Sequence, residues 1–198
     1  MSNARSNRLL MRLPLCAAWM LLGCSIHAQD YFGHTLPGTM CRAGETVLFA
    51  CTLERAKKIA VCARSAGGSP FGDIRYRFGS DARTELEFPA TYQSPATYAS
   101  GATMGDGGRG VLTFLSLRRR DMTYSVYSMV VNPTYQQDEA SESEGVLVER
   151  SGKVLANIHC DPNVGSNAGM LADKRLFGVA VPLANQPLSI FPRFQPSP

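Results

Sequence analysis

The sequence predicts an all-β fold: antiparallel hairpins forming a small eight-stranded barrel or sandwich, stapled by disulfides, with a short C-terminal helical or irregular arm. Short runs of β-branched and aromatic residues come in pairs separated by polar turns, and helical periodicity is absent before Cys160. Four cysteines fall within or beside these runs, behind an N-terminus typical of exported proteins. Eight antiparallel strands must close or cover their edges, which favours a barrel or a sandwich.

The first 28 residues resemble a bacterial secretory signal. Arg5, Arg8 and Arg12 precede an apolar stretch over 13–23, and no acidic residue occurs before Asp30. Cleavage after residue 28 would release a periplasmic or secreted chain, which is the reading we favour. The alternative is a lipoprotein signal ending at residue 23, because 21–24 reads LLGC; Cys24 would then be acylated and the chain would be an outer-membrane lipoprotein. Residues 29–40 are predicted to be a linker.

The predicted β domain spans 41–160. Its eight candidate strands are 46–53, 57–64, 73–79, 84–89, 111–117, 122–131, 145–149 and 153–160, which pair into four hairpins. The residue pattern of the second hairpin predicts its register. The predicted apolar pairs are Ile74 with Phe88 and Tyr76 with Leu86, and the predicted charged pairs are Arg75 with Glu87 and Arg77 with Glu85. Apolar pairs would then fill one face and opposite charges the other.

The turn of the last hairpin is predicted to be a three-residue loop, Arg150-Ser151-Gly152. Gly152 would take a left-handed conformation, so that Glu149 faces Lys153 and Val148 faces Val154.

The cysteines of the exported chain are expected to form two disulfides. Cys51 and Cys62 lie symmetrically about residues 56–57 of the first hairpin, so we expect them to pair, and Cys41 is then left to pair with Cys160. The second bond would join the beginning of the first strand to the end of the last and close a barrel. A metal site is disfavoured, because the chain contains no CxxC pair.

Three segments fall outside the eight strands. Residues 92–110 are rich in glycine and are predicted to be a flexible linker, because their glycines match no nucleotide-binding motif. Residues 135–144 carry four acids and no base, and are predicted to form a solvated acidic loop. Residues 161–198 form a Pro-rich C-terminal arm, with one short helix expected near 168–177.

The sequence offers no catalytic constellation and no cofactor motif. It contains neither a GxSxG nor an HExxH pattern, and His34 and His159 are interpreted as surface or packing residues. Glu85 and Glu87 share a strand face, but their predicted arginine partners favour a structural role. Removal of the signal leaves 17 of the 20 basic residues against 16 acids, which gives no indication of nucleic-acid binding. The triplet at 118–120 is interpreted as a solvated hairpin turn.

Several strings resemble small exported β-proteins of Gram-negative bacteria that carry no assigned activity. These strings are ETVLFAC at 45–51, VCA at 61–63, YRFG at 76–79, ELEFP at 85–89 and GVLVERSGKV at 145–154. The resemblance implies export, disulfides and a β fold, and it implies no catalytic residue. The expected architecture is also similar to that of periplasmic lysozyme inhibitors, although Ser151-Gly152 lacks the tyrosine of their SGxxY loop.

These observations favour a cell-envelope binding or inhibitory module without catalytic activity. The acidic run suggests a basic partner such as a lysozyme, with Asp138, Glu139, Glu142 and Glu144 as the contact residues. The alternatives are an envelope polysaccharide hydrolase acting through carboxylates and a structural outer-membrane lipoprotein. The sequence leaves open the ligand and the oligomeric state.

Overall fold

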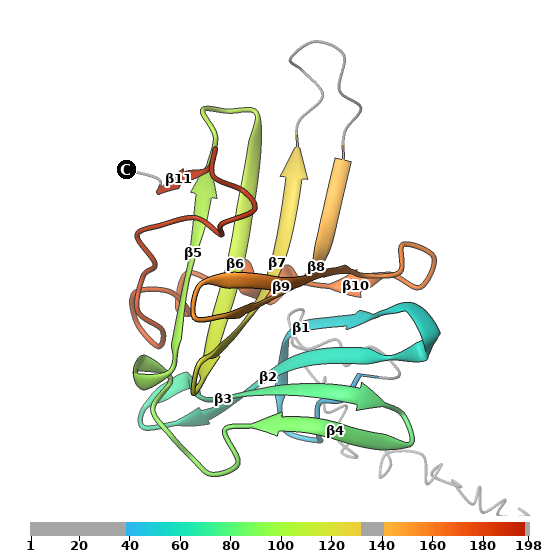
Figure 1. Cartoon of the computed structure of the whole chain (residues 1–198). Coiled ribbons are helices and arrows are strands. Elements are labelled where there is room, and N and C mark those ends of the chain that lie inside the picture. Colours follow the sequence, from blue (N-terminus) through green and yellow to red (C-terminus); the bar gives the residue numbers. More distant parts are fainter. Residues whose placement is uncertain (1–38, 132–140, 197–198) are drawn as a thin grey trace, which may run out of the picture. The chain divides into compact units, whose positions relative to one another are not determined.

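Two antiparallel sheets form the part of the chain that the structure describes. The computed structural model describes residues 39–131 and 141–196. One sheet has the order β10-β1-β2-β3-β4 and the other the order β11-β5-β6-β7-β8-β9. In Figure 1 the long strands of the first sheet run across those of the second. The predicted all-β class is confirmed as a sandwich, and the alternative of a closed barrel is wrong because the two sheets remain separate.

The first sheet is built from β1 (Thr46–Thr52), β2 (Lys58–Ala66), β3 (Ser69–Ser80), β4 (Arg83–Phe88) and β10 (Ser166–Asn167). The second contains β5 (Ala99–Gly105), β6 (Gly110–Arg119), β7 (Met122–Val131), β8 (Ser141–Arg150), β9 (Lys153–His159) and β11 (Gln195–Pro196). Three single-turn helices connect them: η1 (Glu54–Ala56), η2 (Pro95–Thr97) and η3 (Gly169–Ala172). All four predicted hairpins are present. None of the described helices is long and apolar enough to cross a membrane.

The apolar core lies between the two sheets. Tyr76 and Phe88 of the first sheet meet Tyr124 of the second, with ring centroids 5.1 to 5.3 Å apart. Such tilted ring pairs add to the stabilisation from burial. Around them pack the alternate residues of β1 and β2, together with Leu115, Val126 and Val146. Residues that alternate along the strands therefore face this core, and several of their neighbours on the outer faces of the sheets are buried as well.

The register of the second hairpin differs from the prediction by two residues. Tyr76 lies opposite Phe88 and Arg77 opposite Glu87, and the strands are joined by a two-residue turn between Ser80 and Arg83. A shift of two residues keeps every side chain on its predicted face, so the apolar and charged faces are as expected. The turn is shorter than predicted because the backbones approach closely: a Cβ atom at Gly79 would lie 2.2 Å from the Arg83 carbonyl oxygen.

The last hairpin also has a tighter turn than predicted. Arg150 pairs directly with Lys153, and Ser151 and Gly152 both have positive φ angles, at 48° and 79°. Two consecutive left-handed residues form the turn that best matches the twist of a hairpin. The predicted three-residue loop is therefore wrong, although the left-handed Gly152 is confirmed. The bulge lies further along, where Val148 faces Ala156.

The predicted flexible linker at 92–110 contains a full strand, β5. It pairs with β6 from Ala99↔Leu117 to Gly105↔Val111. Its small residues allow close packing: a Cβ atom at Gly101 would lie 2.4 Å from Cε1 of Phe177 and 2.5 Å from the Phe114 carbonyl oxygen. Glycine in this segment thus indicates close packing, and the linker interpretation of 99–105 is wrong.

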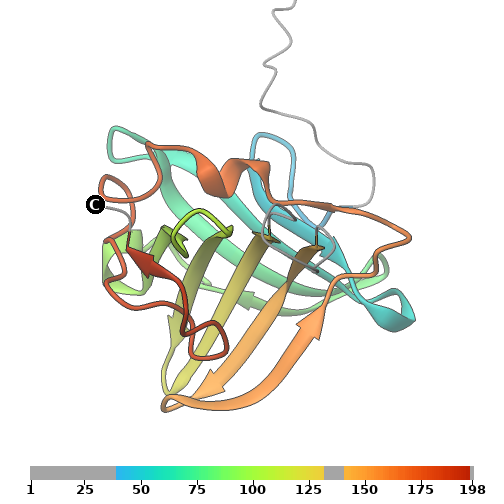
Figure 2. The same cartoon turned by 90° about the horizontal axis from the view of Figure 1, so that it is seen from above.

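The C-terminal arm packs against both sheets. Its first part places Met170, Leu171 and Leu176 in the core between the sheets. Its second part runs beside β5, as Figure 2 shows, and buries Leu188 and Phe194 on the outer face of the second sheet. The helix expected near 168–177 is reduced to the single turn η3.

The four predicted cysteines form two disulfides, but with different partners: Cys41 bonds Cys62, and Cys51 bonds Cys160. The predicted pairs fail because the first hairpin turns about Arg55, so that Cys51 lies opposite Ile59 and Cys62 lies three residues further along. An odd offset places the two side chains on opposite faces of the sheet. Cys51 therefore faces the core, and Cys62 faces outward.

Candidate binding groove

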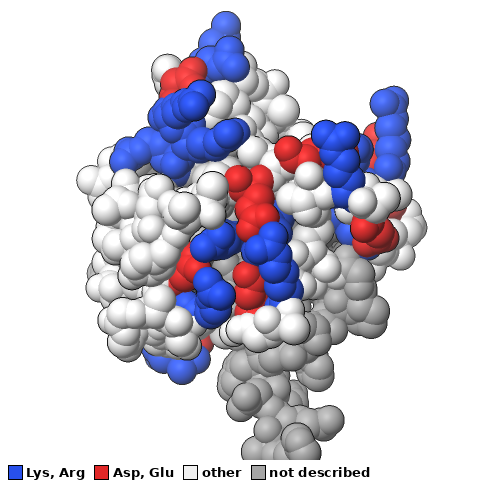
Figure 3. All heavy atoms as spheres, turned by 90° about the horizontal axis from the view of Figure 1, so that it is seen from below, with Lys and Arg blue, Asp and Glu red and all other residues white. Residues whose placement is uncertain are grey.

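Charged side chains cover the outer face of the first sheet. Figure 3 shows acidic and basic side chains interleaved over this face. Four cations and three anions pair along it: Arg42, Arg64, Arg75 and Arg77 with Glu45, Asp73 and Glu87. Alternation along β3 accounts for the pattern, because Asp73, Arg75 and Arg77 point outward while Ile74 and Tyr76 point into the core.

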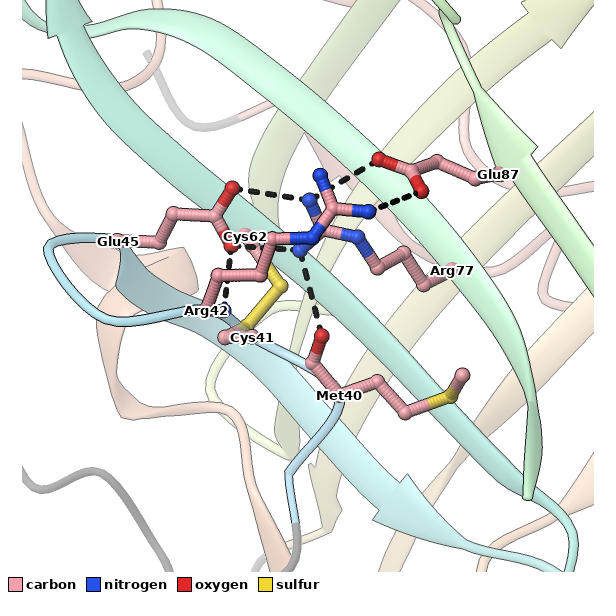
Figure 4. The surroundings of a disulfide bond; sticks show 7 residues. All are labelled: Met40, Cys41, Arg42, Glu45, Cys62, Arg77 and Glu87. Carbon is pink, nitrogen blue, oxygen red and sulfur yellow. Dashed lines mark hydrogen bonds and ion pairs between the residues drawn. A yellow bond between two sulfur atoms is a disulfide. The ribbon is translucent and has the colours of Figure 1, made fainter. Parts of the chain in front are cut away.

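Arg77 lies at the centre of this charged face, with only 1 % of its side chain exposed. Figure 4 shows its guanidinium beneath Arg42 and beside the Cys41–Cys62 disulfide. It donates to Glu45 Oε1 at 2.9 Å, to Glu87 Oε1 at 3.1 Å and to the Met40 carbonyl oxygen at 3.3 Å. Arg42 adds a hydrogen bond of 2.7 Å to Glu87. The disulfide holds residues 40–45 over the sheet, and these residues shield Arg77 from water.

The arginines on this face determine the protonation state of the acids. Burial acts to raise the pKa of Glu45, but hydrogen bonds from Arg77 and from the Arg42 backbone N–H, together with both charges, hold it below its ordinary value. Burial likewise acts to raise the pKa of Asp73, and the hydrogen bonds and charges of Arg75 and Arg64 lower it overall. Both carboxylates are therefore ionised at neutral pH.

These contacts give the charged face a structural role. The carboxylates proposed for glycoside chemistry each face cations, since Glu85 pairs with Lys57, and Glu87 pairs with Arg42, Arg75 and Arg77. Cys41, Glu45 and Cys62 bring their potential ligand atoms within 4.8 Å of one another, but the two sulfur atoms are joined in a disulfide and so are not thiolates. A metal would need those thiolates.

A groove of about 700 Å³ opens where β9 approaches the first sheet. One wall comes from the β1–β2 turn and from Phe78 of β3, and the other from residues 157–163 of β9 and the chain beyond it. Leu53, Phe78 and Ile158 supply apolar surface, and Ile158 is 37 % exposed. Polar groups surround them: Glu54, Lys57, Asn157, His159, Asp161 and Asn163.

Covalent and backbone bonds fix the two walls of the groove together. The Cys51–Cys160 disulfide joins β1 to the end of β9, with its Cα atoms 5.6 Å apart. The next residue, Asp161, donates its backbone N–H to the Thr52 carbonyl oxygen at 2.8 Å. Its carboxylate accepts from the backbone N–H of Asn163 at 2.9 Å and so shapes the following turn. The groove is therefore preformed.

The charges at the mouth of the groove come from both walls. Lys57 forms an ion pair with Glu85, and its Nζ lies 5.9 Å from the centre of the Phe78 ring. Ammonium groups at this distance are attracted to the ring face. Lys57 provides a donor, Glu54 and Asp161 provide acceptors, and each His159 ring nitrogen donates or accepts according to the tautomer. The groove thus combines an apolar lining with hydrogen-bonding groups of both kinds.

His159 belongs to a polar cluster beside the groove. Its Nδ1 lies 3.2 Å from Ser143 Oγ and 3.4 Å from the Tyr127 hydroxyl, which itself donates to Asn157 Oδ1 at 2.9 Å. Burial raises the pKa of Tyr127, although hydrogen bonds with Ser143 and Asn157 oppose the shift. The hydroxyl is therefore neutral and orients the Asn157 and His159 side chains. His159 is exposed and lies beside the Cys51–Cys160 disulfide, at the wall of the groove.

Two of the four predicted contact acids, Glu142 and Glu144, lie among the described residues. Glu142 and Glu144 lie in β8, paired with Val130 and Ser128, so these two belong to a strand and the acidic loop expected over 135–144 is wrong for them. Glu142 is exposed, whereas Glu144 is half-buried. Burial, aided by the charge of Glu142, raises the pKa of Glu144 against the hydrogen bond of Ser128. Asp138, Glu139 and Cys24 lie outside the described residues, as does His34.

The sequence did not predict the groove. Its lining comes from three separate segments, and the Cys51–Cys160 disulfide joins the segment at 157–163 to the first sheet. The pairing expected from the sequence would have placed these segments differently. The correct disulfide pairing, and with it the groove, could have been found from the faces on which the cysteines lie, because two cysteines on opposite faces of one hairpin cannot bond each other.

Comparison of the chain with protein families, with curated proteins and with solved structures found no match. Its function is therefore inferred from the geometry described above.

Proposed function

We propose that this chain is a non-catalytic binding protein of the cell envelope whose ligand site is the groove between β9 and the first sheet. The observation that carries the proposal is an apolar lining, in which Phe78 and Ile158 are partly exposed beside buried Leu53, in a groove fixed by a disulfide. Its volume of about 700 Å³ falls within the range usual for small-molecule sites. Two disulfides indicate an oxidising, non-cytoplasmic location. We propose the periplasm or the exterior as that location.

The lining indicates an amphipathic ligand. An apolar segment would cover Phe78 and Ile158, and polar groups on the ligand would meet Glu54 and Lys57 on one wall and His159 and Asp161 on the other. Because the walls are fixed before binding, little ordering entropy opposes association. A mixed rim of this kind selects molecules that carry both donors and acceptors.

The probe 1-anilinonaphthalene-8-sulfonate, an aromatic ring system with one anionic group, tests this site. The exported, oxidised protein should bind it saturably, with enhanced probe fluorescence. Ile158→Glu should weaken binding at least tenfold, because a carboxylate on the groove wall repels the sulfonate and removes apolar surface. The matched control is Val179→Glu, since Val179 is 73 % exposed and does not line the groove.

Equal binding by Ile158→Glu and the wild type would overturn the proposal. Circular dichroism of both variants establishes that the fold is intact, which separates loss of the site from unfolding. Fluorescence that rises without saturation would count equally against a defined site.

Inhibition of a basic partner such as a lysozyme has less support. Of the described acids predicted for it, only Glu142 is fully available, because Glu144 is half-buried on β8. The hydrolase alternative is weakened by the cations that surround Glu85 and Glu87. Lysozyme inhibition assays at low salt test the first hypothesis directly, and loss of inhibition in Glu142→Gln would support it. Acylation of Cys24, which the lipoprotein alternative requires, is measured by mass spectrometry of the exported chain.

A further inference from the structure

Two hairpin turns lie side by side at one end of the second sheet. The β6–β7 turn follows Arg119, which pairs with Met122, and the β8–β9 turn follows Arg150, which pairs with Lys153. Met122 in turn pairs with Arg150, so the two turns are neighbours in the sheet. The Ser151 backbone N–H donates to the Asp121 carbonyl oxygen at 2.8 Å and links one turn to the other.

Basic side chains gather on these two turns. Arg118, Arg119 and Arg120 come from the first, and Arg150 and Lys153 from the second; all are exposed. Figure 3 shows the basic side chains projecting together beyond the sheet end, away from the interleaved charges of the first sheet. Among residues 39–131 and 141–196, the acids on these two turns are Asp121 and Glu149, which leaves a net charge of about three positive units on the turns. We call these five bases the basic tip.

Most of the positive charge at the basic tip is unneutralised. Arg150 lies 3.4 Å from Asp121, in a pair whose members are 61 % and 57 % exposed. Glu149 accepts a hydrogen bond from Ser189 at 2.9 Å. Arg118 donates to the Thr97 carbonyl oxygen at 3.3 Å, a contact that fixes its side chain without neutralising it. Several guanidinium groups therefore keep donors available for an anion.

A small hollow lies under the first turn. It has a volume of about 250 Å³, and its lining includes Arg118, Arg119 and Arg120 together with Pro89, Gln93 and Tyr98. Guanidinium forks suit phosphate oxygens, because they offer several donors in one plane. The hollow can therefore receive a single phosphate-sized group while the remaining bases face outward.

Apolar side chains flank the basic tip on β9. Val154 is 39 % exposed and Leu155 is 50 % exposed, directly after Lys153. Bases beside exposed aliphatic groups suit the interface of an anionic bilayer, where phosphates meet acyl chains. Single-stranded nucleic acid is usually held by aromatic stacking platforms instead.

We propose that the basic tip docks this protein on an anionic lipid bilayer, with the five bases on headgroup phosphates and with Val154 and Leu155 at the acyl boundary. The orientation follows from the fold, since the bases extend from the ends of β6 to β9. The turn connections hold them in place before contact, so docking requires no folding step. This inference is independent of the ligand groove.

Vesicle flotation tests the proposal with the exported, oxidised protein. Every variant carries Cys24→Ser, so that acylation cannot anchor the chain. Vesicles of phosphatidylglycerol and phosphatidylethanolamine are compared with vesicles of phosphatidylcholine alone. Each base near an anionic surface contributes about fivefold to partitioning at low salt. The triple variant Arg119→Gln, Arg120→Asn, Lys153→Gln should therefore partition about 100-fold more weakly.

A matched control removes the same charge elsewhere. Arg55→Asn, Arg83→Gln, Lys174→Gln changes three exposed bases outside the tip, and Arg55, like Arg120, has a φ angle of 57°. This control should retain most of the binding. Leu155→Ser should weaken binding severalfold even at high salt, whereas Val179→Ser should leave it unchanged.

Three results would overturn the proposal. One is equal loss of binding in the tip variant and its control, which would indicate a response to net charge only. Another is equal partitioning onto phosphatidylcholine vesicles. The third is displacement of the protein from anionic vesicles by another anion. Either inorganic phosphate that displaces more protein than sodium chloride does at the same ionic strength, or displacement by duplex DNA, would assign the basic tip to a different anion. Thermal unfolding of each variant confirms that the sheets are intact.

Discussion

The outer faces of the two sheets are covered by different kinds of contact. Over the first sheet, residues 40–45 and a network of arginines and carboxylates lie above buried Arg77, held by the Cys41–Cys62 disulfide. Over the second sheet, the C-terminal arm buries Leu188 and Phe194 against Tyr127 and Phe114 without any disulfide. One cover depends on charge and a covalent bond, and the other depends on removal of apolar surface from water.

This difference shows how one chain protects two sheet faces with short segments. The segment at 40–45 is too small to bury much apolar surface, so it relies on hydrogen bonds to charged groups and on its cysteine. The arm is longer and contributes rings, with Phe191 5.1 Å from Tyr127 and 6.3 Å from Phe194 between centroids. The first cover should therefore respond to pH and to reducing agents, and the second to apolar truncation.

The largest expected effect is loss of the disulfide that joins the sheets. Cys51 and Cys160 are 109 residues apart, against 21 for Cys41 and Cys62. In the chain-entropy treatment, removing the Cys51–Cys160 disulfide lowers the free energy of unfolding by roughly 4.8 kcal/mol, and removing the Cys41–Cys62 disulfide lowers it by roughly 3.4 kcal/mol. The difference arises because the longer loop constrains the unfolded chain more. Urea unfolding of the two double Cys→Ala variants measures the difference. Peptide mapping without reduction provides the control, and a Cys51–Cys62 peptide would contradict the observed pairing.

Truncation of the apolar cover comes next. Phe194 is fully buried on the second sheet, so Phe194→Ala should cost about 4 kcal/mol through lost burial and the cavity left behind. The loss should change little from mild acid to neutral pH, because it comes mainly from apolar contacts. The charged group on the ring, the Arg193 guanidinium 5.2 Å from its centre, stays protonated throughout this range. Chemical unfolding at several pH values tests this. A cost under 1 kcal/mol would mean that the arm does not cover the sheet in solution.

The charged contacts over the first sheet should, in contrast, contribute a stability that depends on pH. Arg77→Met leaves Glu45 and Glu87 without their shared partner. We expect it to lower the free energy of unfolding by about 3 kcal/mol at neutral pH. This value is at the low end for a broken buried ion pair, because Arg42 and Arg75 still face Glu87. The methionine matches the length of the arginine side chain, so that packing changes little.

The pH dependence of that cost has a definite sign. Because the pKa of Glu45 lies below its ordinary value of 4.5, its contribution to stability is present above that value and is lost as pH falls through the folded-state pKa. Asp73 behaves likewise. The difference between wild type and Arg77→Met should therefore shrink in acid. Unfolding curves from neutral pH downward measure it, and a constant difference would contradict the role of the carboxylates.

The same contrast explains what the sequence could predict. Alternation located all eight predicted strands and placed the charged and apolar residues of β3 on opposite faces, because faces depend only on parity. Turn lengths are harder to predict, because Gly79 allows a close approach of two backbone segments that residue propensities do not reveal. The register error in the first hairpin then changed both disulfides, because three residues of offset reverse the face of Cys62.

The candidate sites were less predictable than the strands. The groove and the basic tip both combine segments that are far apart in the chain. Leu53 and Ile158 line the same groove, and Arg119 and Arg150 each pair with Met122 on the strand between them. The triplet at 118–120 lies at the solvated turn that the sequence predicts, but the neighbouring turn that adds to its charge lies thirty residues further along the chain. Long-range pairing carries this information, and no local pattern records it. The strand β5 was missed because its small residues reflect the arm packed on it.

The smallest effect concerns an acid on β8 of the second sheet. Glu144 Oε2 is buried and has no hydrogen-bond partner among the described residues, and burial together with the Glu142 charge raises the pKa of this carboxyl. A raised pKa in the folded state means that stability is greatest below the ordinary value and falls as pH rises through the folded-state pKa. Glu144→Gln should therefore stabilise the protein at neutral pH by about 1 kcal/mol, because a neutral amide costs less to bury, and the gain should vanish in acid. Thermal unfolding of Glu144→Gln beside Glu142→Gln measures this, since Glu142 is exposed and its change should have a smaller effect. An equal gain in both variants would assign the effect to repulsion between the two acids, and a loss in Glu144→Gln would show that its hydrogen bond with Ser128 outweighs the cost of burial.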